Sequence, residues 1–282
     1  MSRSQPRATQ QHTTQQQTTQ QQTGSNPAPA RRAGALLASR LALVAAATVV
    51  AWMLAGGLAG TASFPPSPML ASLSLLPVNI VSLVLVARFL KTEGTSLRGL
   101  FNFERRRLPA DLAWAVLWLT VLAVPFAATI LGTVWLLHGE QTFTAFETIF
   151  FAPDAATISS PGLALALGVL TVLTFAPLNA PAEEAVYRGY ALSRLSAAWP
   201  PALAIAVTAL TFGLQHAFFA PSSGAMLVYV AAFTVWGLGA ALIVRWQKRL
   251  LPVTIAHFVV NLMTSLPAVI FPALQLTGAI PA

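Results

Sequence analysis

Residues 162–178 read GLALALGVLTVLTFAPL, an apolar run that contains no charged side chain. An α-helix needs about 17–25 such residues to cross the hydrocarbon core of a membrane. Similar runs recur along the chain at about 41–59, 69–90, 113–137, 201–217, 225–243 and 252–272. The sequence therefore predicts an all-α fold, a polytopic transmembrane bundle of about seven helices, with six to eight as the range.

The composition supports a protein whose surface faces lipid. Of the 282 residues, 56% are hydrophobic and 9% are charged, whereas soluble domains carry about 25% charged residues. The chain has no cysteine, which excludes disulfides, thiolate metal sites and a cysteine nucleophile.

The net charge of +8 could indicate a nucleic-acid binder, but the placement of the basic residues indicates a membrane topology instead. With the N-terminus in the cytoplasm, we expect all 16 Lys and Arg in cytoplasmic segments or at the helix ends that border them. The other side of the membrane would receive Glu140, Glu147 and Asp154 and no basic residue. This is the positive-inside bias of membrane proteins, and it leaves no role for nucleic acid.

Four regions follow from these patterns. Residues 1–32 form a Gln/Thr-rich tail that we expect to be disordered. Residues 33–159 hold the first helices and an outer loop in which Phe143, Phe146 and Phe150 recur at helical spacing, as in a helix that lies in the membrane interface. Residues 160–272 hold the remaining helices, and 273–282 a short tail. The first apolar run is long for a signal peptide, so we expect a retained anchor, although residues 60–63 faintly resemble a cleavage site.

The first unusual motif reads APAEEAVYRG over residues 180–189. Pro177 and Pro181 interrupt the apolar run before it, which predicts a broken helix with both glutamates in the first turn of a new one. Glu184 and Arg188 are four residues apart and can form an ion pair on one helix face. Glu183 is rotated by about 100° from Glu184, so we expect it to remain a free base.

Two further polar motifs lie on later apolar runs. Phe212 and His216 share one helix face, and so do His257 and Asn261. Each histidine alone could be a core residue that hydrogen-bonds a neighbouring helix. Ionisable residues at membrane depth are costly, however, and usually mark function.

Together, the three motifs resemble those of the CPBP family of intramembrane proteases, which includes type II CAAX prenyl proteases and bacteriocin-processing enzymes. That family carries Glu-Glu-x-x-x-Arg, Phe-x-x-x-His and His-x-x-x-Asn motifs on successive membrane helices, matched here over about residues 160–272. The resemblance implies an intramembrane endopeptidase in which Glu183, helped by His216, activates water, while His257 and Asn261 stabilise the oxyanion. Glu184 and Arg188 would be the supporting structural pair.

The resemblance also leaves alternatives open. Glu183, His216 and His257 could hold a zinc ion, although we favour an enzyme without a cofactor. A non-catalytic membrane scaffold and a small transporter are the non-protease alternatives. We expect a multi-pass protein of the cell membrane, of the bacterial plasma membrane type, whose partners are the lipid bilayer and a peptide or protein substrate. Both CAAX-type processing and bacteriocin or peptide processing fit the sequence.

Overall fold

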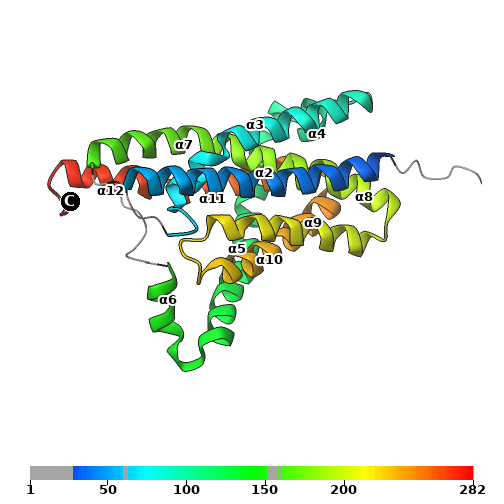
Figure 1. The fold of residues 1–282 in the computed structure, drawn as a ribbon. Coiled ribbons are helices and arrows are strands. Elements are labelled where there is room, and N and C mark those ends of the chain that lie inside the picture. The colour runs from blue at the N-terminus through cyan, green and yellow to red at the C-terminus, as the bar shows by residue number, and fades with distance from the viewer. Residues whose placement is uncertain (1–27, 60–62, 151–157, 159, 282) are drawn as a thin grey trace, which may run out of the picture.

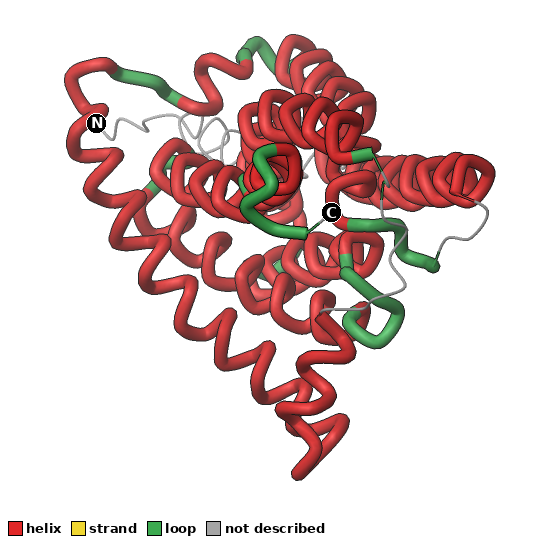
Figure 2. Tube along the Cα trace, turned by 90° about the vertical axis from the view of Figure 1, so that its left-hand side faces the viewer, coloured by secondary structure: helices red, strands yellow, loops and turns green. Residues whose placement is uncertain are grey.

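The computed structural model describes residues 28–59, 63–150, 158 and 160–281, and every regular element within these ranges is helical (Figures 1 and 2). The α-helices are α2 (Ala28–Ala59), α3 (Pro68–Thr92), α4 (Leu97–Phe101), α5 (Leu108–His138), α6 (Thr142–Phe150), α7 (Pro161–Glu184), α8 (Leu192–Ala198), α9 (Pro201–His216), α10 (Met226–Gln247), α11 (Leu251–Ser265) and α12 (Pro267–Leu276). Three short 3₁₀ segments are η1 (Arg105–Arg107), η2 (Gly139–Gln141) and η4 (Ala217–Phe219), and η3 (Ala185–Ala191) is π-helical.

The predicted number of membrane crossings is confirmed for the described part of the chain. Seven helical stretches there are long and apolar enough to span a bilayer. They are Ala28–Gly57, Pro68–Thr92, Leu97–Phe150, Pro161–Ala198, Pro201–Phe219, Met226–Gln247 and Leu251–Leu276. Each contains one of the apolar runs of the sequence, so the protein is a multi-pass membrane protein.

Two helices extend beyond the region boundaries expected from the sequence. Helix α2 begins at Ala28, so the last residues assigned to the polar tail are helical. Helix α12 continues to Leu276, which places its last turn inside the predicted C-terminal tail. The disorder expected for residues 1–27 and the cleavage-like residues 60–62 lie outside the described residues.

The helix break predicted at Pro177 and Pro181 is absent. Both prolines lie inside α7, and helical backbone continues through η3 and α8 as one stretch from Pro161 to Ala198. Proline in a membrane helix is tolerated where neighbouring elements compensate for the lost hydrogen bond, and α7 is packed against α3, α11 and α12. The departure from α-helical geometry follows the glutamates instead, as the π-helical turns of η3.

Helix α7 is the central element of the bundle. It contacts α3 on one side and α11 and α12 on another, while α9 packs on α10 and α10 on α5 (Figure 1). The buried core gathers around η3, with Tyr187, Tyr190 and Phe212 all fully enclosed. By contrast, Val124 and Leu173 are each 68% exposed, as expected for helix faces that contact lipid rather than water.

The outer-loop helix predicted from the spacing of the phenylalanines exists as α6. Phe143 is 82% exposed, whereas the Phe146 and Phe150 rings lie 4.5 Å apart and pack toward Tyr229 of α10. Figure 1 shows α5 and α6 as a V-shaped pair at one side of the bundle. Of the three rings, therefore, Phe143 alone is turned fully outward, and an interfacial position for α6 stays a prediction.

Candidate active site

The two adjacent glutamates lie in the last turn of α7, and both are completely buried. The expected ion pair is present, with Arg188 Nη1 3.0 Å from Glu184 Oε1. The guanidinium of Arg188 also lies over the ring of Phe212, 4.1 Å from its centroid. This cation–π contact links the glutamate motif of α7 and η3 to the Phe-x-x-x-His motif of α9.

The carboxylate of Glu183 is not unpaired, as the helical rotation had suggested. Its Oε1 accepts hydrogen bonds from Arg40 Nη2 at 3.0 Å and from Gln215 Nε2 at 2.8 Å. A carboxylate enclosed in apolar protein needs such compensation, because burying an unpaired charge is very costly. Of the two carboxylate oxygens of Glu183, Oε2 is the one that has no hydrogen-bond partner among the described residues.

Arg40 is the main residue of the buried cluster that the sequence did not reveal. We expected every Arg and Lys at a cytoplasmic segment or helix end, yet Arg40 lies inside α2, about 18 Å from its first residue, and is 1% exposed. Its partners are the uncharged side chains of Asn79, Ser82, Asn179 and Gln215 together with Glu183. The signal that could have found it is a single arginine within an otherwise uncharged apolar run.

His257 lies between the two glutamates. Its Nδ1 is 2.9 Å from Glu184 Oε1, and its Nε2 is 3.5 Å from Glu183 Oε2. Because the carboxylate of Glu184 is already paired with Arg188 and only accepts hydrogen bonds, Nδ1 of His257 is the donor. Asn261, one turn further along α11, is also buried, and its Nδ2 has no partner among the described residues.

His216 joins the cluster from α9. Its Nδ1 lies 2.7 Å from the carbonyl oxygen of Phe212, which can only accept, so Nδ1 carries the proton and Nε2 is the basic nitrogen of the neutral ring. The ring is stacked on Phe233 of α10, with centroids 3.6 Å apart and planes 9° from parallel. Stacking and the backbone hydrogen bond together fix the orientation of the imidazole.

The structure therefore brings together all six residues singled out from the sequence. Glu183, Glu184 and Arg188 come from α7 and η3, His216 from α9, and His257 and Asn261 from α11. The set is completed by Arg40 from α2, so two buried cations balance two buried carboxylates. This charge balance is what allows four ionised groups to lie inside a membrane protein.

The residues do not form a ready metal site. Within the ranges that the structure describes, no group of three His, Asp or Glu side chains is placed so that it could hold a metal ion. The Oε1 atom of Glu183 is bonded to a guanidinium, which competes with any cation for that oxygen. The proposed zinc ligands Glu183, His216 and His257 thus do not fit a metal in this arrangement.

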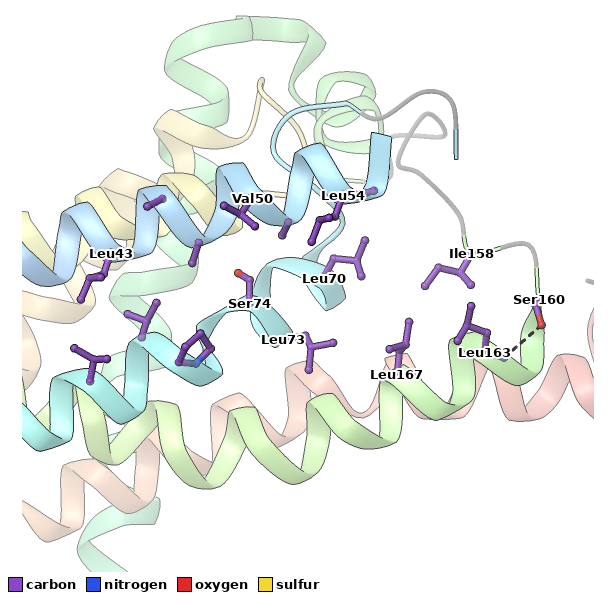
Figure 3. A pocket seen from close by; sticks show the side chains of 17 residues that line it. Leu43, Val50, Leu54, Leu70, Leu73, Ser74, Ile158, Ser160, Leu163 and Leu167 are labelled. Carbon is purple, nitrogen blue, oxygen red and sulfur yellow. Dashed lines mark hydrogen bonds between the residues drawn. The ribbon is translucent and has the colours of Figure 1, made fainter. Parts of the chain in front are cut away.

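An apolar cavity of about 780 Å³ lies between α2, α3 and the start of α7 (Figure 3). Its lining is aliphatic except for the hydroxyl groups of Ser74 and Ser160. Leu43 in this lining is one helical turn from Arg40, and Val78 is adjacent to Asn79. The cavity therefore lies between the level of Arg40 on α2 and the end of the bundle where α2 ends and α7 begins, and its lining contains none of the residues of the polar cluster.

A comparison with known protein families matches the segment that carries these motifs. Residues 163–263 match the family model described as type II CAAX prenyl endopeptidase Rce1-like. No curated protein and no solved structure gave a match. The matched segment contains all three polar motifs, and it confirms the resemblance seen in the sequence: residues 163–263 of this multi-pass membrane protein are similar to the Rce1-like CAAX endopeptidase family.

Proposed function

We propose that this protein is an intramembrane endopeptidase of the glutamate type, which hydrolyses a peptide bond in the buried polar cluster. Glu183 is the general base, helped by His216, and His257 and Asn261 form the oxyanion hole. Glu184 and Arg188 are the supporting pair. The substrate class is a protein or peptide processed at the membrane, either of the CAAX type named by the family or a bacteriocin-like peptide.

One observation carries this proposal, namely that the cluster contains a buried acceptor and a buried donor that the protein itself does not use. Glu183 Oε2 and Asn261 Nδ2 have no hydrogen-bond partner among the described residues, and the same holds for Glu184 Oε2 and Arg188 Nη2 of the supporting pair. Leaving a buried polar group unpaired costs about 1–3 kcal/mol, and such groups call for a specific explanation. A water on Glu183 and a carbonyl oxygen on Asn261 would satisfy both atoms, and these are the two species that peptide hydrolysis requires.

The chemistry follows from these positions. Oε2 of Glu183 takes a proton from water while the water oxygen bonds to the carbonyl carbon, and the carbonyl oxygen becomes an oxyanion. Asn261 Nδ2 and His257 Nε2 donate hydrogen bonds to that oxyanion. The C–N bond then breaks as Glu183 returns its proton to the leaving amine, which leaves a free carboxyl group and a free amine.

The oxyanion role sets a condition on His257. Its Nδ1 already donates to Glu184, so Nε2 can donate as well only when the ring is an imidazolium. The carboxylates of Glu183 and Glu184 lie on either side of the ring. Glu184 thus supports catalysis by orienting His257 in addition to neutralising Arg188.

The test is cleavage by purified full-length protein of a peptide library that includes lipidated and unmodified C-terminal peptides. We expect Glu183→Gln to abolish cleavage and Asn261→Ala to lower kcat by about 100- to 1,000-fold, the usual cost of one oxyanion donor. Chelators should leave the wild type active. Cleavage that does not depend on Glu183 would contradict the proposal. The absence of any cleavage would also contradict it, in favour of a scaffold or transporter. Activity lost on chelation and restored by zinc would favour the metal-dependent protease.

A further inference from the structure

We propose that Arg40 is a positioning residue for the general base: it holds Oε1 of Glu183 so that Oε2 alone is presented to water and to His257. This inference rests on the proposed function and extends it to α2, which lies outside the segment matched by the family model. Arg40 is not expected to touch the reacting atoms. It acts through Glu183.

The geometry of the guanidinium supports this role. Nε of Arg40 donates to Gln215 Oε1 at 3.0 Å, Nη1 to Ser82 Oγ at 2.9 Å, and Nη2 to Glu183 Oε1 at 3.0 Å. The planar fork is therefore anchored at all three nitrogens by side chains from α2's neighbours α3, α7 and α9. A guanidinium fixed in this way fixes the carboxylate oxygen bonded to it.

Gln215 provides a second restraint on the same oxygen. Its Nε2 donates to Glu183 Oε1 at 2.8 Å, while its Oε1 accepts from Arg40 Nε and from the hydroxyl of Tyr187, each at 3.0 Å. The two donors to its oxygen define which way the amide points. Glu183 Oε1 is thus held by two groups that also hold each other, and the carboxylate cannot turn Oε1 toward the substrate without breaking both bonds.

The same network argues against Arg40 as a substrate-binding residue. Its side chain is fully buried, and Nη2 already lies within 3.4 Å of Asn79, Asn179 and Glu183 oxygens. A substrate carboxylate would have to displace these partners. The arrangement instead resembles the second layer of groups that hold catalytic side chains within a fraction of an ångström of their productive positions.

The experiment compares Arg40→Met, which removes the charge and the hydrogen bonds, with Arg40→Lys, which keeps a point charge without the fork. Both are made in the full chain and assayed with the peptide that the wild type cleaves in a Glu183-dependent manner. Arg32→Gln is the matched control, since Arg32 lies on the same helix, is exposed and bonds only the Thr92 hydroxyl among the contacts described. Thermal unfolding in detergent is measured for each variant.

We expect Arg40→Met to lower kcat by about 100-fold, the effect of misplacing a reacting group by about 1 Å, with KM nearly unchanged. Arg40→Lys should recover part of this loss, and Arg32→Gln should behave as the wild type. A residue needed only for folding would lower the unfolding temperature but leave the kcat of the folded fraction intact. Wild-type kcat in folded Arg40→Met would overturn the inference.

Ser82→Ala decides the question if Arg40→Met does not fold. It removes one hydrogen bond from Nη1 of Arg40 but leaves the ion pair between Arg40 and Glu183 in place, so we expect the fold to be retained. The inference then requires a lower kcat with KM unchanged, and an unchanged kcat would overturn it. Failure of the proposed function is recognised separately, because in that case the wild type itself shows no Glu183-dependent cleavage, and the role of Arg40 falls with it.

Discussion

Adjacent glutamates with different partners are the central feature at the scale of single residues. Glu184 Oε1 accepts hydrogen bonds from both Arg188 and His257, whereas Glu183 Oε1 is held by Arg40 and Gln215. Each carboxylate thus neutralises one buried arginine. Both glutamates keep an Oε2 atom without a hydrogen-bond partner within the described structure. Because Oε2 of Glu183 is the one that faces Nε2 of His257, Glu183 is the better candidate for the base.

Glu184→Ala should destabilise the protein strongly. The substitution leaves Arg188 buried without its counter-charge and removes the acceptor of His257 Nδ1. Breaking a buried ion pair by deleting one partner typically costs about 3–5 kcal/mol. Unfolding in detergent would measure the loss, with the exposed Glu140→Ala as control. An unfolding free energy equal to that of the control would show that Glu184 is not the structural partner of Arg188.

The residues of the site differ in how well the sequence reveals them. Ionisable side chains in apolar runs at helical spacing, such as Glu183 and His257, are conspicuous because their burial is costly. Arg40 has no motif around it, and its position inside a helix depends on α2 starting at Ala28 rather than after Arg32. Asn79 and Gln215 are neutral, so no sequence rule separates them from ordinary helix-packing residues.

At the scale of elements, hydropathy identified all seven spanning stretches, but the local course of the backbone could not be read from it. Two prolines predicted a break in α7, yet neighbouring helices enclose this segment and the helix continues. The π-helical turns of η3 bury all seven residues from Ala185 to Ala191. Such turns are frequent at functional sites, and here they immediately follow Glu183 and Glu184, a placement set by tertiary packing.

A polar link joins the end of α3 to α8. Glu93 accepts hydrogen bonds from Arg194 Nε and from the hydroxyl of Tyr190. Burial alone would raise the pKa of Glu93, but these hydrogen bonds and the charge of Arg194 outweigh it and lower the pKa below its usual 4.5. A depressed carboxyl pKa stabilises the fold above the unfolded-state value, and this contribution is lost as the pH falls through the folded-state value.

Glu93→Gln should therefore lower the unfolding temperature at pH 7, in keeping with about 0.2–1 kcal/mol for a partly exposed ion pair. The difference between wild type and variant should persist down to about pH 4.5, the ordinary carboxyl value, and disappear in stronger acid. Thermal unfolding across this pH range measures it. A difference that is the same at every pH would assign the link to packing rather than to the charge of Glu93.

At the scale of the whole molecule, contacts between distant segments define one end of the bundle. Arg194 of α8 bonds Glu93, Arg245 of α10 bonds Ser196, and Arg249 bonds Asp111 at the start of α5. These segments were assigned to one side of the membrane from their basic residues alone. Their meeting in the structure agrees with that assignment.

An aromatic cluster lies near this basic end. Trp114 and Trp118 are stacked with centroids 5.2 Å apart, and Trp246 meets both rings edge-on. Trp118 also donates its Nε1 hydrogen to Gln247. Trp is enriched where membrane helices meet the headgroup layer, so this cluster marks the expected depth of the interface on the side of Arg245 and Arg249.

Reporter fusions decide the orientation of the bundle. The excess of Lys and Arg at this end predicts that it faces the cytoplasm, because basic loops are retained there during insertion. Fusions placed after Lys91, Arg194 and Arg249 should therefore report cytoplasm, and a fusion near Glu147 in α6 should report the opposite side. If all four signals were inverted, the helix count would stand and the orientation would be reversed. If Glu147 reported the same side as Arg194, the single span between them, Pro161–Ala198, would not cross the membrane and would have to be withdrawn.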